Sequence, residues 1–204
     1  MVFITRALRK VTAIPDRAMP TQHVCRSMLL SLCLLFAPPL HAGEFAITNV
    51  NTRLQDNVYL LSAHVDYRFS DEALAALENG VPLTLRLEIE IQRKRDWWLD
   101  ATVATLEQRY QLQFHPLSHQ YVLQNLNSSA FYAYQSLSSA LEAMGTLNDF
   151  PLVDEQLIKE DEHYEVLLQA ELDIESLPSP LRLLAYITPS WRLNSDWYTW
   201  SLTP

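Results

Sequence analysis

The stretch VPLTLRLEIEIQ, residues 81–92, decides the fold class of this chain. Apolar and polar residues alternate along all of it. A period of two residues is typical of a β-strand that buries one face and exposes the other, and one solvated face favours an antiparallel sheet. The apolar face carries Leu83, Leu85, Leu87, Ile89 and Ile91, and the polar face carries Thr84, Arg86, Glu88, Glu90 and Gln92.

The same alternation recurs along the chain. It is strongest over residues 163–175, HYEVLLQAELDIE, where Leu167 alone interrupts the polar side. We therefore expect an α+β fold that is mostly antiparallel β-sheet in a sandwich-like arrangement, with two or three short helices. Weaker versions of the pattern predict further strands over residues 46–51, 58–69, 102–114, 120–126, 131–135 and 197–202.

Three short helices are predicted from their end signals. The Ser70 hydroxyl can accept a free backbone N–H at the start of residues 71–79, and Gly80 supplies the stop. The second helix starts at Ser136 or Ser139 and ends at Gly145. The third starts at Pro180 and ends before Pro189.

Residues 26–42, RSMLLSLCLLFAPPLHA, have the pattern of a secretory signal peptide. Arg26 precedes an apolar run from Met28 to Ala37, and two prolines lead to Ala42, a small residue suited to signal peptidase. The run is shorter than the roughly 20 apolar residues that a membrane-spanning helix needs. The pattern therefore favours export over a permanent membrane span.

This leader predicts the domain organisation and the location of the protein. Residues 1–42 form a leader that is cleaved after Ala42, and residues 43–204 form a single domain in the periplasm, without a stable membrane span. The alternative is a chain that keeps its leader and is anchored in the inner membrane through residues 28–40.

Removal of the leader changes the chemistry that the protein can use. After Ala42 the chain has 10 basic and 23 acidic residues, a net charge of −13, compared with −9 for the whole chain. Both cysteines, Cys25 and Cys33, lie in the leader, which leaves no thiol for disulfides, metal binding or catalysis. An acidic surface repels phosphate backbones, so nucleic acid is not an expected partner.

Motifs of known catalytic chemistry are missing from the sequence. The only glycines, Gly43, Gly80 and Gly145, are far apart, which excludes glycine-rich phosphate-binding loops. No GxSxG or HExxH motif is present. We therefore expect no cofactor, and the sequence favours a non-catalytic protein over an enzyme.

The strongest candidate binding surface is RKRDWW, residues 93–98. Arginine and tryptophan dominate binding hot spots because they combine large contact area with directed donors. A partner peptide, glycan or lipid headgroup could dock here. The alternative is a turn with one tryptophan anchored in the core and a solvated basic cluster. The candidate residues are Arg93, Lys94, Arg95, Trp97 and Trp98.

Histidines supply the remaining candidates. His115 and His119 would converge on a metal ion if they lay on a helix, but Pro116 and the flanking strand patterns predict a turn, so they are only weak candidates for metal ligands. His64 shares the polar face of its strand with Asp66, and the two could act as a general base. An ordinary cross-strand pair is the simpler reading, because no nucleophile is identifiable.

Three stretches resemble the domain-of-unknown-function family 4390: DYRFSDEALAALENGVPLTLRLEIEI (66–91), QRYQLQFHPLSHQYVLQNLN (108–127) and SDWYTW (195–200). The similarity covers nearly all of the predicted domain. This resemblance implies a secreted or envelope protein of proteobacteria, and relatives of this kind are associated with two-component signalling. It assigns no catalytic or binding residue.

The function that the sequence favours is a non-catalytic binding or adaptor module of the cell envelope, with an envelope protein or peptide as its partner. One alternative is a His-dependent hydrolase or metal-binding enzyme. Another is an assembly or chaperone factor that offers a sheet edge to client strands.

Overall fold

The central strand of the fold is the one that residues 81–92 predict. The computed structural model describes residues 44–95, 99–159 and 161–202, and the predicted leader with its cleavage site lies outside them. β3 (Leu83–Arg93) pairs with β4 (Ala101–His115) on one side and with β8 (Tyr164–Leu172) on the other, both antiparallel. All five alternating apolar side chains of β3 are fully buried.

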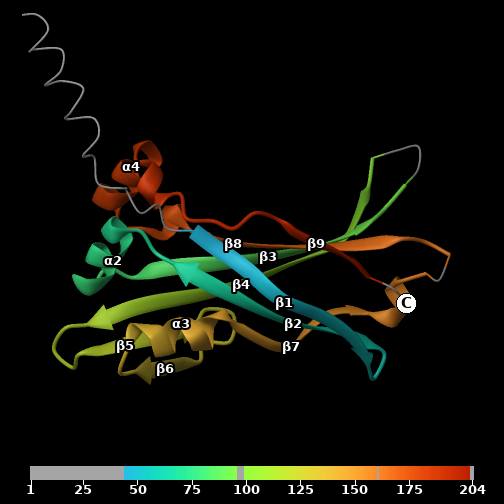
Figure 1. The fold of residues 1–204 in the computed structure, drawn as a ribbon, viewed down its shortest axis with the longest axis horizontal. Helices are drawn as coiled ribbons and strands as arrows, with labels where there is room; N and C mark the ends of the chain where they lie inside the picture. The colour runs from blue at the N-terminus through green and yellow to red at the C-terminus, as the bar shows by residue number, and fades with distance from the viewer. Residues whose placement is uncertain (1–43, 96–98, 160, 203–204) are drawn as a thin grey trace, which may run out of the picture. The chain divides into compact units, whose positions relative to one another are not determined.

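The strands of the described residues form two antiparallel sheets (Figure 1). The larger sheet has the order β6-β5-β4-β3-β8-β9, and the smaller one has the order β1-β2-β7. The predicted α+β, sandwich-like fold is therefore confirmed. The remaining strands are β1 (Glu44–Gln55), β2 (Val58–Arg68), β5 (Gln120–Asn125), β6 (Phe131–Tyr134), β7 (Thr146–Asp154) and β9 (Tyr198–Leu202).

One hydrophobic core joins the inner faces of the two sheets. Phe45 of β1 packs edge-on against Tyr67 of β2, with ring centroids 4.9 Å apart. At the side of the sandwich, the indole N–H of Trp200 in β9 donates to Thr52 Oγ1 in β1 at 2.8 Å. Burying one large apolar side chain contributes about 1.5–3 kcal/mol, so the alternating inner faces hold the two sheets together.

The helices α2 (Asp71–Glu78), α3 (Leu137–Gly145) and α4 (Ser179–Ile187) lie close to their predicted positions. The backbone N–H of Ala73 donates to Ser70 Oγ, which confirms the predicted cap. Ser136, rather than Ser139, caps α3. Among the helices that the structure describes, none is long and apolar enough to cross a membrane. Short 3₁₀ turns are η1 (Glu155–Leu157), η2 (Ile174–Ser176) and η3 (Pro189–Trp191).

β7 is a strand that the sequence pattern did not predict. It pairs with β2 through a register that shifts twice. Asp149 has a φ of +52°, and Pro151 has no N–H to donate, so neither residue suits a regular strand. Pairing with β2 therefore overrides a local sequence that lacks alternation.

The two ends of the sandwich carry different elements. Glu44, the first residue of β1, pairs with Arg68, which leads into α2. α2 contacts η3, and η3 contacts α4, so Figure 1 shows α2 and α4 at the same end. We call this the helical end. At the other end, the backbone N–H of Glu155 in η1 donates to the carbonyl of Asn57 in the β1–β2 turn.

Gly145, the last residue of α3, is packed against β2. A Cβ atom at this position would lie 2.1 Å from the carbonyl oxygen of Val65. Gly80 meets a different requirement, because its φ of +82° lies in the left-handed region and it has space around it. Close approach of two backbones, and not a left-handed turn, therefore requires glycine at position 145.

We expect Gly145→Ala to lower the free energy of unfolding by about 3 kcal/mol, because β2 or α3 must move to admit the methyl group. Gly80→Ala should cost about 1–2 kcal/mol, since it imposes only a left-handed conformation on alanine. Urea denaturation of the two variants measures the difference. Equal losses, or a neutral Gly145→Ala, would show that α3 and β2 are not in this close contact.

Candidate functional site

The predicted binding surface at residues 93–98 begins where β3 ends. Trp97 and Trp98 lie outside the described residues, so docking on this surface stays a prediction. The side chains of Arg93 and Lys94 are held by carboxylates, which neutralise much of the expected basic charge. The ion pairs join Arg93 to Glu162 at 2.8 Å, Lys94 to Asp100 at 2.8 Å and Lys94 to Glu165 at 3.1 Å.

These ion pairs shift the protonation of their members. Hydrogen bonds from Arg93 and Tyr164 hold the pKa of Glu162 below its ordinary value of 4.5. Hydrogen bonds to Asp100 and Glu165 raise the pKa of Lys94. A ligand at this surface would therefore have to displace carboxylates that already occupy the cations.

His115 and His119 lie at the turn between β4 and β5, as Pro116 predicts. Both side chains are exposed, and the ring of His119 lies 6.2 Å from that of Phe114. In the described ranges, no group of three or more His, Cys, Asp and Glu residues is arranged to hold a metal ion. The two histidines are thus turn residues on the surface.

His64 lies in a cavity of about 250 Å³ between β2 and α3. Its Nε2 is 3.9 Å from Glu142, and its Nδ1 is 3.5 Å from the Thr146 hydroxyl. The Asp66 carboxylate accepts hydrogen bonds from Arg68 at 2.8 and 3.0 Å. The side chain closest to His64 Nε2 is therefore Glu142 and not Asp66, because the Asp66 carboxylate pairs with Arg68.

Ser138 supplies the hydroxyl of the same cavity. Its Oγ lies 3.1 Å from the Oγ of Ser136, the residue that caps α3. A nucleophilic serine needs a hydrogen bond to its base, and the described hydrogen bonds include none between Ser138 and His64. In the described residues Ser138 therefore contacts Ser136 and not His64.

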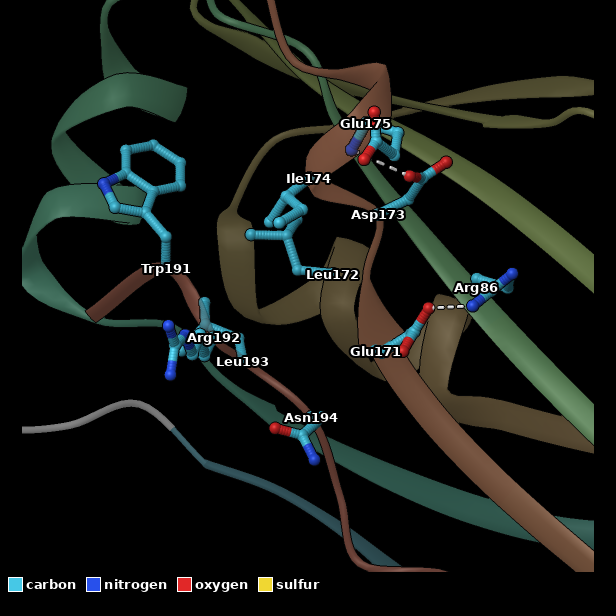
Figure 2. A pocket seen from close by; sticks show the side chains of 10 residues that line it. All are labelled: Arg86, Glu171, Leu172, Asp173, Ile174, Glu175, Trp191, Arg192, Leu193 and Asn194. Carbon is cyan, nitrogen blue, oxygen red and sulfur yellow. Dashed lines mark hydrogen bonds and ion pairs between the residues drawn. The ribbon is translucent and has the colours of Figure 1, made fainter. Parts of the chain in front are cut away.

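A larger cavity of about 350 Å³ lies where β8 ends (Figure 2). Figure 2 shows Trp191 at one side and the Arg86–Glu171 ion pair at the other. Burial lowers the pKa of Arg86. The negative charge of Glu171 and the hydrogen bond to Glu171 raise this pKa by more, so the net shift is upward. Arg109 of β4 likewise pairs with Asp173. These ion pairs join β3 to β8 and β4 to the residue after β8, which indicates a structural role, although the buried Nε atoms of Arg86 and Arg109 have no hydrogen-bond partner in the described residues.

α4 exposes a contiguous apolar surface. Leu183 and Ile187 are one helical turn apart and expose 72% and 77% of their area, and Leu184 and Tyr186 expose 46% each. Within this helix only Ala185 is buried. We call Leu183, Leu184, Tyr186 and Ile187 the α4 apolar face. Exposed apolar side chains grouped in this way mark interaction surfaces.

β6 is the outermost strand of the larger sheet, and among the described residues it pairs with β5 alone. Phe131 and Tyr132 expose 72% and 60% of their area. Residues 120–141 contain no charged residue, no histidine and no proline, although the predicted mature chain has 23 acids. We call Phe131–Tyr134 with its unpaired side the β6 edge.

The other edge strands of the described sheets are protected. Proteins block edges with bulges, prolines, charges or covering segments, because an edge presents unpaired N–H and C=O groups. β1 has a bulge after Thr48, and β7 contains Asp149 and Pro151. β9 is joined to β1 by the Trp200–Thr52 hydrogen bond. The β6 edge has none of these features, and its length of four residues is what limits its pairing with another strand.

A cavity of about 190 Å³ lies beside the β6 edge, against α3. The Tyr110 hydroxyl, whose pKa burial raises from its ordinary value of 10.0, is protonated at neutral pH and can donate a hydrogen bond. No residue that lines the cavity is charged. The lining consists of Tyr110, Leu123, Asn125, Ser128, Ala130, Tyr132, Tyr134 and Ala143.

The fold and these surfaces define the chain as an α+β sandwich domain with an open, uncharged aromatic sheet edge. Residues 42–201 match the family described as domain of unknown function (DUF4390), and the chain therefore belongs to this family. The match confirms the resemblance of the three sequence stretches. No curated protein and no solved structure matches the chain.

Sequence reasoning missed the β6 edge and the α4 apolar face, although it predicted both elements. The uncharged run over residues 120–141 is a signal that could have identified the edge. The α4 face has a weaker signal, because its leucines and Tyr186 are equally compatible with core packing.

The Arg93–Glu162 pair predicts a pH dependence of stability. Because the pKa of Glu162 is lowered on folding, its contribution is complete above the ordinary value of 4.5 and is lost as the pH falls through the lowered pKa. We expect Glu162→Gln to be less stable than the native chain at neutral pH and equal to it at strongly acidic pH. Urea denaturation across this range tests the expectation, and a pH-independent difference would contradict it.

Proposed function

We propose that the chain is an exported, non-catalytic binding module that pairs with an extended segment of a partner polypeptide at the β6 edge. The observation that carries the proposal is an edge strand with exposed Phe131 and Tyr132 and with no bulge, proline or charged residue, although it is only four residues long. Strand addition satisfies the free backbone groups of an edge, and these main-chain hydrogen bonds provide affinity for many sequences.

The cavity beside the edge supplies specificity. Successive residues of a strand point to opposite faces of the sheet, so every second side chain of an added strand would face the side of Tyr132 and Tyr134. The cavity volume of about 190 Å³ suits a side chain of moderate size. Because its lining is uncharged, we expect the partner residue to be apolar or aromatic.

Charge supports the same class of partner. The domain after the leader carries a net charge of −13, and the neutral stretch over residues 120–141 interrupts this acidic surface. An uncharged β-prone segment would meet no repulsion there, whereas an acidic segment would be repelled by the rest of the domain. A fixed partner would make the protein an adaptor of the envelope, and unfolded client strands would make it an assembly factor.

We expect a capped peptide of alternating valine and threonine to bind the β6 edge of the isotopically labelled chain. Amide resonances of residues 131–134 should shift and become protected from exchange, because the peptide completes their hydrogen bonds. The same peptide with every backbone nitrogen methylated should not bind, since neither of its edges can then donate a hydrogen bond to β6.

Phe131→Lys should weaken this binding about tenfold, equivalent to about 1.4 kcal/mol, because an edge lysine opposes strand pairing. Leu157→Lys is the matched control, since Leu157 is 59% exposed but lies in η1. Equal effects of the two variants, or equal binding of the methylated peptide, would refute strand addition at β6.

Export to the periplasm is part of the proposal, and it is supported by the signal-like pattern of residues 26–42. We expect the protein recovered from a periplasmic extract to begin at Gly43. N-terminal sequencing gives the answer directly. Recovery of an intact leader in the membrane fraction would instead establish the anchored form.

A further inference from the structure

A cavity of about 410 Å³ lies between β1 and β9, which are edge strands of the two sheets. Trp200 of β9 and Thr52 of β1, joined by a hydrogen bond of 2.8 Å, both line it. Small-molecule sites in proteins have volumes of roughly 300–1,000 Å³. We call this cavity the β1–β9 cleft, and its volume suits a small ligand.

Tyr59 of β2 also lines the β1–β9 cleft, and its hydroxyl lacks a partner. The residue exposes only 2% of its area, and the buried hydroxyl makes no hydrogen bond to any of the described residues. A buried hydroxyl without a partner is unfavourable, because it has given up its hydrogen bonds to water. An ordered water molecule or a hydroxyl of a ligand would satisfy it.

The rest of the lining combines uncharged polar groups with apolar surface. Asn51, Thr52 and Ser201 supply an amide and two hydroxyls, which can donate and accept hydrogen bonds. The apolar part consists of Val50, Leu54, Trp200 and Leu202. A charged ligand would lose its hydration here without gaining an opposite charge, and a purely apolar ligand would leave the polar groups unsatisfied.

We propose that the β1–β9 cleft binds a neutral saccharide. A sugar ring has faces of C–H groups, which can pack against an indole or an aliphatic side chain, and a rim of hydroxyls, which donate and accept hydrogen bonds. It therefore matches both parts of the lining. The inference goes beyond strand addition at β6 and does not depend on it, because β6 and β9 are opposite edges of the larger sheet.

Titration of the isotopically labelled full chain with maltose, cellobiose, lactose and diacetylchitobiose tests the proposal. We expect at least one of these neutral disaccharides to shift the indole N–H resonance of Trp200 and the amide resonances of residues 50–54, while residues 131–134 stay unchanged. No shift with any of them would overturn the proposal and leave ordered water as the partner of Tyr59. Decanol is the apolar probe, and shifts with decanol alone would assign the cleft to apolar chains instead.

Tyr59→Phe removes the unpartnered hydroxyl and keeps the ring. We expect it to weaken disaccharide binding about tenfold without lowering the free energy of unfolding of the ligand-free chain, because the hydroxyl has no bond to the protein to lose. The matched control is Tyr67→Phe, which should bind as the native chain does. Tyr67 lies on the same strand and has a similarly buried, unpartnered hydroxyl, but it does not line the cleft.

Two results with these variants would also overturn the proposal. Equal losses of binding in Tyr59→Phe and Tyr67→Phe would show that the effect does not arise in the cleft. A lower free energy of unfolding for ligand-free Tyr59→Phe would show that the hydroxyl already has a partner within the protein.

Discussion

The burial of one face of β3 is the constraint on which the rest of the structure depends. Its five inward side chains are completely buried, and its backbone is paired on both sides. A strand of this kind requires a layer of apolar side chains opposite it, which β2 and β1 supply. It also requires a neighbouring strand on each side, and these two neighbours, β4 and β8, lie far from one another in sequence. The polar face follows the same register at Arg86 and Glu171, which are paired residues of β3 and β8, and Arg109 of β4 pairs with Asp173 just after β8.

Local sequence patterns predicted the elements whose own residues carry the signal, either as alternating apolar and polar side chains or as residues that cap a helix. Strict alternation identified β3 and β8, and the Ser70 hydroxyl and Gly80 marked the two ends of α2. β7 was not predicted, because its strand conformation depends on pairing with β2 and because a proline such as Pro151 disfavours a strand in the sequence pattern. Gly145 was read as a helix stop, whereas its actual role is to let α3 approach Val65, a contact between residues 80 positions apart.

The candidate sites were harder to predict because binding depends on which side chains and backbone groups remain without a partner after the chain has folded. Residues 93–98 looked basic in sequence, but Glu162, Asp100 and Glu165 are brought to Arg93 and Lys94 only by folding. Asp66 likewise prefers Arg68 to His64. Conversely, the sequence did not single out Phe131 or Leu183, and only the strand order and the position of α4 show them to be exposed.

The hydrogen bond between Trp200 and Thr52 makes the two sides of the sandwich different. It joins the two sheets along the side of β1 and β9, while β6 is the edge strand at the other side of the larger sheet. A polypeptide added there would lengthen the row of strands without loosening the fastened side, and its gain in pairing would not be offset by a loss elsewhere in the core. The hydrogen bond and the proposed binding edge thus lie on opposite sides of the larger sheet.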